Sequence, residues 1–202
     1  MKTGIAYIIS APSGTGKSSL IDALINTQNE SLTNIHIVTS YTTRNIRPGE
    51  INGKHYHFIS TIQFKNMIQK NIFFEYTKTF NNYYGTSKSS IEPILKIGVD
   101  ILLNIDWKGA QKVRNKIAKT CSIFIIPPST EELERRLRNR NQKEKEKTII
   151  QRTKHANNEL NHIKEYDYLI VNDNFNIALS NLRRIILAEK IKTIHQKSNK
   201  IN

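Results

Sequence analysis

A loop near the start of the chain combines glycine, lysine and serine at a spacing that could hold phosphate groups. It reads SAPSGTGKSS at residues 10–19 and follows the apolar run at residues 5–9. Glycines let backbone N–H groups turn inward around phosphate oxygens, and the N-terminus of a following helix attracts the same anion. Lys17 would add a positive charge, and Ser18 a hydroxyl for Mg2+. The loop therefore predicts binding of a nucleotide's phosphates, as in ATPases, GTPases, small-molecule kinases and transporters.

The match to the formal phosphate-binding motif is relaxed at its first position, which is Ala11 in place of glycine. The alternative is a glycine-rich turn that binds nothing, but the expected strand before the loop and helix after it favour binding. The residues expected to contact the phosphates are Ala11, Pro12, Ser13, Gly14, Thr15, Gly16, Lys17, Ser18 and Ser19.

A second group of polar residues, further along the chain, could hold another phosphate and a purine base. Arg44 and Arg47 bracket a turn, and two guanidinium groups can grip one phosphate bidentately. The phenol groups of Tyr56 and Tyr84 could complete that grip. Glu75 lies inside an apolar segment, where a carboxylate needs a partner or a ligand that donates to it. Among the common bases only guanine offers two suitable parallel donors, its N1–H and its 2-amino group.

Length and composition predict one α/β domain, with room for small inserted subdomains. The 202 residues are enough to bury a sizeable core. There is no apolar run of about 18 residues and no signal-peptide pattern at the N-terminus, so we expect a soluble, cytoplasmic protein. The single Cys121 cannot form an internal disulfide and is expected to be a small core residue.

The net charge of +14 arises from 31 Lys and Arg against 17 Asp and Glu. Such a charge could indicate nucleic acid, an anionic membrane or phosphorylated small molecules as partners. However, the chain is rich in Lys, Asn and Ile together, as biased codon usage would produce. We therefore give weight only to basic residues at particular positions.

Strand-like and helix-like segments alternate along most of the chain, which predicts a parallel sheet covered by helices. Continuous apolar runs predict buried strands, and Ser129 and Glu132 have the spacing of a helix-capping box. The expected strands are residues 5–9, 100–105, 121–126 and 168–171. The expected helices are residues 18–25, 107–118, 130–140 and 175–192.

Two segments depart from this alternation. The segment from about residue 36 to 90 predicts an inserted subdomain with a small mixed or antiparallel sheet. Its expected strands are residues 36–40, 55–58 and 72–77, with turns at Pro48-Gly49 and Asn52-Gly53. The charged stretch at residues 138–148 has low hydrophobicity and predicts a mobile, solvated flap.

Five motifs follow one another along the chain: APSGTGKS (11–18), TTRNIRPGE (42–50), NYYGT (82–86), NIDWKGAQ (104–111) and IVND (170–173). In order and spacing they resemble the motifs of guanylate kinase, and the resemblance runs from about residue 4 to 190. It implies a P-loop α/β fold with a three-layer core and parallel sheet at about residues 1–35, 91–128 and 166–202. It also implies a small mixed-β region that binds the nucleoside monophosphate at about 36–90 and a helical lid at about 129–165.

The resemblance further implies ATP-dependent phosphorylation of GMP, with dGMP as a second acceptor and Mg2+ as cofactor. No general base is expected, since the acceptor is an already ionised phosphate oxygen. The residues implied to contact guanine are Ser40, Glu75, Thr86 and Asp106, and those implied to hold the GMP phosphate are Arg44, Arg47, Tyr56 and Tyr84. Asn172 is implied to lie near the adenine of ATP. The residues implied in catalysis are Lys17, Arg44, Arg136, Arg140 and Arg152, with Arg135 and Arg138 as alternatives to Arg136.

Asn104 departs from the family pattern, in which many members have an aspartate. An asparagine can accept a hydrogen bond from a metal-bound water but contributes no charge. The implied Mg2+ would then depend on Ser18, partly through water, and on Asp106 and the ATP phosphates. The implied lid also departs, because lysines alternate with glutamates at residues 143–147 and the spacing from Arg140 to Arg152 is one residue longer.

Three other functions are compatible with parts of the sequence. A related binding module without catalysis would not need Lys17 and Arg44, which are both present. A kinase for a phosphorylated sugar would need the ATP loop but not Ser40, Glu75 and Thr86. A nucleic-acid-binding role depends on charge alone. The expected partners are therefore ATP and GMP or dGMP, with no specific nucleic acid and no membrane, while the oligomeric state stays open.

Overall fold

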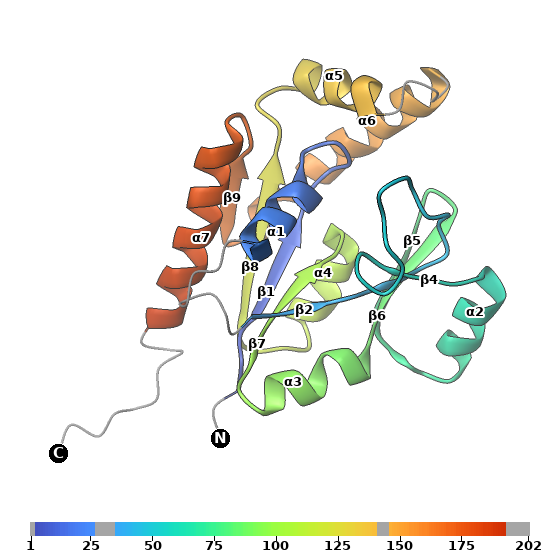
Figure 1. Ribbon diagram of the computed structural model, residues 1–202, viewed down its shortest axis with the longest axis vertical. Helices are drawn as coiled ribbons and strands as arrows, with labels where there is room; N and C mark the ends of the chain where they lie inside the picture. The colour runs from blue at the N-terminus through green and yellow to red at the C-terminus, as the bar shows by residue number, and fades with distance from the viewer. Residues whose placement is uncertain (1–2, 27–34, 141–145, 193–202) are drawn as a thin grey trace. The chain divides into compact units, whose positions relative to one another are not determined.

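The computed structural model describes residues 3–26, 35–140 and 146–192, apart from the side chains of residues 140 and 146–148 (Figure 1). The chain divides into two compact units. The first consists of residues 1–8 and 34–120, and the second of residues 9–33 and 121–202. The expected glycine-rich loop belongs to the second unit, and the expected base-binding residues belong to the first.

The larger sheet has five strands in the order β2-β7-β1-β8-β9. In the first unit β2 pairs in parallel with β7, and in the second β8 pairs in parallel with β9. The strands are β1 (Ala6–Ser10), β2 (Ile35–Val38), β7 (Asp100–Asn104), β8 (Thr120–Ile126) and β9 (Tyr168–Val171). All four strands predicted from continuous apolar runs are therefore confirmed, as expected for strands covered on both faces.

The smaller sheet lies wholly in the first unit and has the order β4-β3-β6-β5. The pair β3–β4 is parallel, whereas β3–β6 and β5–β6 are antiparallel. Its strands are β3 (Tyr41–Thr42), β4 (His57–Phe58), β5 (Phe73–Thr79) and β6 (Asn82–Ser87). The predicted small mixed sheet is confirmed, and Gly49 and Gly53 have the positive φ angles, both 82°, that its predicted turns require.

One predicted strand was assigned to the wrong sheet. The run at residues 36–40 was expected in the small sheet, but β2 belongs to the larger sheet and pairs with β7, with Ile35 opposite Asp100. Only the next segment, β3, enters the small sheet. A four-residue strand carries too little pattern to select a partner that lies 65 residues away along the chain.

The helices of the first unit are α2 (Thr61–Gln69), α3 (Glu92–Lys96) and α4 (Trp107–Arg114), with a short 3-10 turn η2 (Lys88–Ser90). Helix α4 ends four residues before its predicted end. Helix α2 was not predicted, because only one of its side chains, Phe64, is buried and its apolar pattern is correspondingly weak. It is nevertheless well capped, since Ser60 and Gln63 form a complete capping box.

The helices of the second unit are α1 (Lys17–Asn26), α5 (Thr130–Arg140), α6 (Glu146–Leu160) and α7 (Phe175–Ile191), with a short 3-10 turn η3 (Ile163–Glu165). Helix α7 runs beside β9 and packs on α1 (Figure 1). The buried side chains of these elements include Leu20, Leu24, Ala178, Leu182 and Ile186. No helix among the described residues is both long and apolar enough to cross a membrane.

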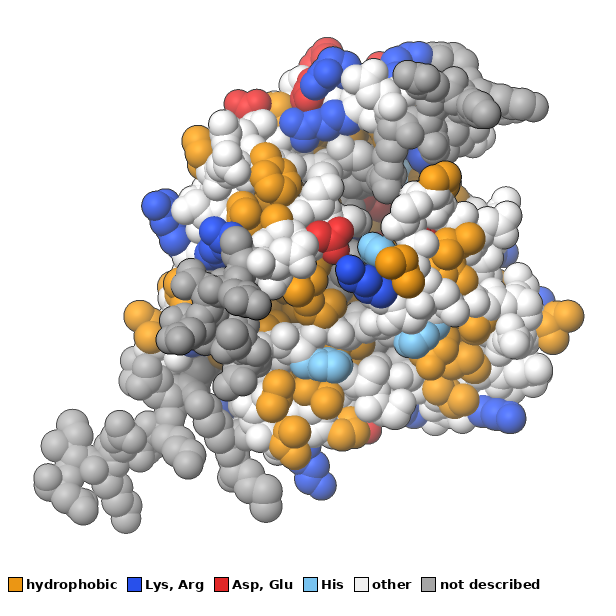
Figure 2. All heavy atoms as spheres, viewed as in Figure 1, with side chains coloured by type: hydrophobic (Ala, Val, Ile, Leu, Met, Phe, Trp, Pro, Cys, Tyr) orange, Lys and Arg blue, Asp and Glu red, His pale blue; other side chains and the backbone are white. Residues whose placement is uncertain are grey.

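The charged stretch at residues 138–148 is helical at both ends, because α5 continues to Arg140 and α6 begins at Glu146. Residues 141–145, which include Lys143 and Lys145, lie outside the described residues. Helices α5 and α6 pack together through Leu133, Leu137, Ile149 and Ala156. In Figure 2 acidic and basic side chains are mixed over α5, so the helix carries a solvated charged face as well as a buried one.

Phe64→Ala should lower the free energy of unfolding by about 3–5 kcal/mol, the usual cost of removing a buried aromatic ring. Phe64 is fully buried, stacks on Phe73 and Tyr83 at centroid distances of 4.3 and 5.2 Å, and attaches α2 to the small sheet. Chemical denaturation would measure the loss. Ile62→Ala is the matched control, since Ile62 is 73% exposed on the same helix. Equal effects of the two substitutions would contradict this role for Phe64.

Candidate functional site

The glycine-rich loop has the predicted setting between a strand and a helix. It connects β1, which ends at Ser10, to α1, which begins at Lys17. Gly14 and Gly16 have φ angles of 95° and 87°, a backbone conformation that favours glycine. Thr15 is buried and donates its hydroxyl to the Pro12 carbonyl at 3.0 Å. The loop is thus folded by its own contacts, with α1 directly after it.

Two side chains of the second unit hold this loop from outside. Asn172 is 4% exposed and donates its Nδ2 to the Thr15 carbonyl oxygen at 2.6 Å. A Cβ at Gly16 would lie 2.6 Å from the same nitrogen, and a Cβ at Gly14 would lie 2.9 Å from a methyl carbon of Leu137. Glycine at both positions therefore allows the positive φ angle and also the close approach of the Asn172 and Leu137 side chains to the loop. Asn172 positions the loop, while its implied contact with adenine stays a prediction.

Arg136 is the implied lid arginine that the structure places near the loop. Its Nε donates to Glu132 at 2.7 Å, and its Nη1 donates to the Asn172 carbonyl oxygen at 3.0 Å. Hydrogen bonds from Arg135 and Arg136 lower the pKa of Glu132 to about 2. At the start of α5 the backbone N–H of Glu132 donates to the Ser129 hydroxyl oxygen at 3.1 Å. One half of the predicted capping box is therefore present.

The other two implied lid arginines lie on the helices around the undescribed segment. Arg140 is the last residue of α5, and its side chain lies outside the described residues. Arg152 is half-buried in the middle of α6. Their part in catalysis stays a prediction.

In the first unit, three of the four implied guanine-binding residues form one buried chain of hydrogen bonds. Thr86 donates its hydroxyl to Glu75 Oε1 at 2.7 Å, and Ser40 Oγ lies 3.0 Å from Thr86 Oγ1. Because Thr86 gives its only hydroxyl proton to Glu75, Ser40 must donate to Thr86. The pairing of β5 with β6 sets this geometry by placing Glu75 opposite Thr86.

Glu75 is 4% exposed, and burial raises its pKa from 4.5 to about 7. The hydrogen bond from Thr86 and the nearby Lys112 lower this pKa, whereas the charge of Asp106 raises it further. The hydroxyl and the backbone N–H of Thr86 do not saturate a carboxylate with four lone-pair sites. A ligand that donates two hydrogen bonds to Glu75 would favour its ionised form.

Asp106, the fourth implied guanine-binding residue, is anchored at the start of α4. Its Oδ1 accepts the N–H of Gly109 at 2.8 Å, which caps the helix. Its Oδ2 accepts the hydroxyls of Thr77 and Thr79 at 3.0 and 3.1 Å. Sequence reasoning missed both threonines. The signal was the alternation of β5, which places residues 75, 77 and 79 on one face of the strand.

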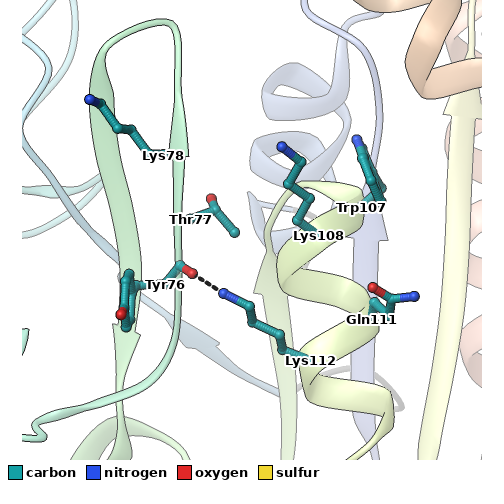
Figure 3. Close-up of a pocket in the computed structure, with 7 residues that line it drawn as sticks. All are labelled: Tyr76, Thr77, Lys78, Trp107, Lys108, Gln111 and Lys112. Carbon is teal, nitrogen blue, oxygen red and sulfur yellow. Dashed lines mark hydrogen bonds between the residues drawn. The ribbon is translucent and has the colours of Figure 1, made fainter.

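Gly109 was also missed, and it determines how closely α4 approaches Glu75. A Cβ at Gly109 would lie 2.8 Å from Glu75 Oε2. Lys112 on α4 and Lys116 in the turn after it donate to the carbonyl oxygens of Tyr76 and Phe74 on β5. Figure 3 shows Lys112 reaching across to Tyr76. Helix α4 and the turn after it are thus attached to β5, an edge strand that pairs with β6 on its other side.

Between β5 and α4 lies an open pocket of about 410 Å3 (Figure 3). Its charged lining is entirely basic. The lining residues are Tyr76, Thr77, Lys78, Trp107, Lys108, Gln111 and Lys112. Thr77 connects this pocket to the base-binding residues, because its hydroxyl donates to Asp106.

The implied GMP-phosphate residues form a second cluster in the first unit. Glu50 binds the end of the Arg44 guanidinium bidentately, accepting from Nη1 at 3.0 Å and from Nη2 at 2.8 Å. The second Nη1 hydrogen goes to the Asn45 carbonyl. The Nε–H and the remaining Nη2–H have no partner among the described residues, and together they form the side fork that can grip a phosphate.

Aromatic rings surround this guanidinium. The Arg44 carbon Cζ lies 5.7 Å from the ring centroid of Tyr56, which contacts the ring of Tyr84 at 6.1 Å. Burial raises the pKa of Tyr56 to about 12, so its hydroxyl stays protonated and able to donate. Arg47 adds its backbone N–H to Glu50 at 2.9 Å. The structure therefore brings the four implied phosphate-binding residues together around the turn that begins at Arg44.

The residues that could hold Mg2+ offer oxygen atoms, the ligands that this ion prefers. Asn104 Oδ1, at the end of β7, is buried and has no hydrogen-bond partner among the described residues. Ser18, at the start of α1, has an exposed hydroxyl-bearing side chain. The described residues contain no group of three or more His, Cys, Asp or Glu that could chelate a metal by themselves. This donor set fits an ion held mainly by nucleotide phosphates and water.

The larger sheet, the glycine-rich loop between β1 and α1, and the separate small sheet define a P-loop α/β protein. Within this class, the family model "Guanylate kinase" matches residues 3–189. The chain therefore belongs to the guanylate kinase family, whose enzymes phosphorylate GMP to GDP with ATP.

Individual relatives give the same result. Guanylate kinase from Buchnera aphidicola subsp. Schizaphis graminum is 53% identical over 198 residues, which cover 98% of this chain and 94% of the relative. Guanylate kinase from Escherichia coli K12 is 51% identical over 197 residues, with 98% and 94% covered. The crystal structure of guanylate kinase from Anaplasma phagocytophilum superposes with a TM-score of 0.78 at 32% identity, covering 98% of this chain and 92% of that one.

Gly109→Ala should raise the KM for GMP by about tenfold without destabilising the protein. The new methyl group would displace the Glu75 carboxylate, a flexible side-chain end, while alanine favours the helix by up to about 1 kcal/mol. Steady-state kinetics and thermal unfolding would measure the two effects. An unchanged KM for GMP would contradict the close fit between Gly109 and Glu75.

Glu75 should titrate near pH 7 in the free protein and at lower pH with GMP bound, because donors from the base favour the carboxylate. Carboxyl-carbon NMR would give both midpoints. The raised pKa also means that the stability contributed by Glu75 is fully present below pH 4.5 and is lost as pH rises through about 7. Glu75→Gln should remove both effects, and a free-protein midpoint near 4.5 would refute the prediction.

Proposed function

We propose that the chain transfers the γ-phosphoryl group of ATP to GMP and to dGMP, forming ADP and the diphosphate. The observation that carries this proposal is the buried hydrogen-bond chain from Ser40 through Thr86 to Glu75. It ends on a carboxylate with acceptor capacity left for the N1–H and 2-amino group of guanine. We expect dGMP to be accepted as well, because the assigned residues would contact only the base and the phosphate, and both nucleotides have these groups.

The GMP phosphate would be held by Arg44, Arg47, Tyr56 and Tyr84. In this proposal Glu50 fixes the end of the Arg44 guanidinium and leaves the side fork for the phosphate. Burial opposes ionisation of Glu50, but its hydrogen bonds from Arg44 and the Arg47 N–H lower its pKa, so the ion pair is present at neutral pH. Because Glu50 already fixes the guanidinium of Arg44, less side-chain entropy is lost when the phosphate binds.

The ATP phosphates would be held by the backbone N–H groups of the glycine-rich loop and by Lys17. Phosphoryl transfer requires placement of two anions and neutralisation of the charge that spreads over the transferring group. Lys17, Arg136, Arg140 and Arg152 would supply that positive charge, with Arg44 on the acceptor. The Ser18 hydroxyl, with waters that Asn104 can orient, would hold Mg2+, which neutralises phosphate charge when bound.

Helices α5 and α6 would act as the lid, closing over bound substrates to exclude water that would otherwise hydrolyse ATP. The arginines of α5 and α6 support this assignment, because closure would bring cations to the reacting phosphates. We place the reaction in purine nucleotide metabolism in the cytoplasm.

A coupled ADP-release assay with ATP and Mg2+ tests the function directly. The acceptors to compare are GMP, dGMP, AMP, CMP and UMP. We expect turnover with GMP and dGMP only. Preference for AMP or UMP, or no turnover with any acceptor, would overturn the proposal.

Glu75→Gln should raise the KM for GMP by about 100-fold, because the amide presents a donor where guanine also donates. The KM for ATP should stay within twofold. Glu92→Gln is a matched control, since Glu92 is exposed in the first turn of α3 in the same unit. Survival of GMP selectivity in Glu75→Gln would show that another group reads the base.

A further inference from the structure

The Asp106 carboxylate accepts hydrogen bonds from three donors of its own unit, and its two oxygens accept different numbers of them. Oδ2 accepts two hydroxyls, from Thr77 at 3.0 Å and from Thr79 at 3.1 Å. Oδ1 accepts one backbone N–H, from Gly109 at 2.8 Å. Each carboxylate oxygen has about two lone-pair sites. Oδ2 is therefore saturated, and Oδ1 keeps one site for a ligand.

The two threonines reach Asp106 because of the periodicity of β5. Glu75, Thr77 and Thr79 point to the same face of the strand. Thr77 is 6% exposed and Glu75 is 4% exposed, so this face of β5 is buried at both positions. One strand thus presents a carboxylate of its own and two hydroxyls that orient a second carboxylate on α4.

The donors to Asp106 are neutral. No lysine or arginine among the described residues forms an ion pair with its side chain. Hydroxyl donors fix the rotation of a carboxylate without cancelling its charge, whereas a guanidinium would occupy two acceptor sites and neutralise it. This arrangement suits a carboxylate whose remaining lone pair must receive a hydrogen bond from a neutral base.

We propose that Thr77 and Thr79 are positioning residues for guanine recognition. They fix the Asp106 carboxylate by its Oδ2, so that Oδ1 alone presents an acceptor to the base. The proposal rests on the assignment of Asp106 to the GMP site made above. It adds two specificity-determining side chains whose hydroxyls, among the described residues, hydrogen-bond to Asp106 and not to the base.

A purely structural role, fastening β5 to α4, is the competing explanation. Other contacts already fasten these elements, since Lys112 and Lys116 donate to carbonyl oxygens of β5 and Gly109 packs against Glu75. Loss of the hydroxyls should therefore change the presentation of Asp106 more than it changes stability. The experiment has to separate these two effects.

The test compares Thr77→Val, Thr79→Val and the double variant with Thr77→Ser and Thr79→Ser. Valine keeps the branched shape that suits a strand, and serine keeps the hydroxyl donor. The double valine variant should raise the KM for GMP about tenfold or more, with kcat and the KM for ATP within twofold. The serine variants should match the parent protein. If the double variant does not fold, the single valine variants carry the same comparison.

Asp106→Ser supplies the second measurement. Serine keeps a side-chain oxygen that can cap α4, but it has no carboxylate for the threonine hydroxyls to orient. The valine substitutions should have no further effect on the KM for GMP in this background, because they act through the carboxylate. An equal effect in both backgrounds, or an unchanged KM in the valine variants, would overturn the proposal.

The outcomes separate the positioning role from the proposed function. If Asp106→Ser leaves the KM for GMP unchanged while GMP is still phosphorylated, Asp106 does not contact the base and the positioning role is refuted with it. If GMP is not phosphorylated by the parent protein, the proposed function itself is wrong. If Asp106→Ser raises the KM and the threonine variants do not, only the positioning role is refuted.

Discussion

The burial of the Glu75 carboxylate is the constraint on which the acceptor site depends. An ionised carboxylate removed from water costs several kcal/mol unless donors replace the lost hydration. The protein provides one strong donor, the Thr86 hydroxyl, and the pKa of Glu75 is accordingly raised to about 7. The folded protein thus keeps a carboxylate that is only partly satisfied. In the proposed site, a base with two parallel donors would supply the missing hydrogen bonds, and the selectivity for guanine would then follow from the cost of burying the carboxylate.

The attachment of α4 to β5 follows from the same constraint. Glu75 can be both buried and accessible to a base only if the element beside it approaches closely without covering the carboxylate. Gly109 permits that approach, and Asp106 caps α4 so that the helix begins at Trp107, directly after it. Lys112 and Lys116 then bind the carbonyl oxygens of a strand edge that would otherwise be unpaired. Helix α4 and the residues at its two ends therefore cover the edge of β5 and hold the second carboxylate.

The sequence predicted the features that are determined by local residue patterns. It did not predict the features that depend on a contact with a distant part of the chain. Four strands of the larger sheet, β1, β7, β8 and β9, and the setting of the glycine-rich loop between a strand and a helix are local patterns, and these were predicted correctly. The partner of β2 depends on pairing with β7, and α2 depends on one buried ring, Phe64. The resemblance to guanylate kinase implied Ser40, Thr86, Glu75 and Asp106 as a set. It did not reveal Thr77 and Thr79, whose hydrogen bonds to Asp106 appear only when β5 and α4 lie side by side.

The buried polar atoms that the chain leaves unsatisfied are informative about where ligands act. Native proteins pair nearly all buried polar groups, so an unpaired one needs an explanation. Ser10 Oγ and Asn104 Oδ1 are two such atoms in the described part of the chain, and each lies at the carboxyl end of a strand of the larger sheet. Open α/β sheets bind ligands at that edge. Asn104 has an oxygen there without a charge, so in the proposed reaction neutralisation of the phosphates would depend more heavily on lysine and arginine. The strong positive charge of the chain as a whole gives no such information, because it is not tied to positions.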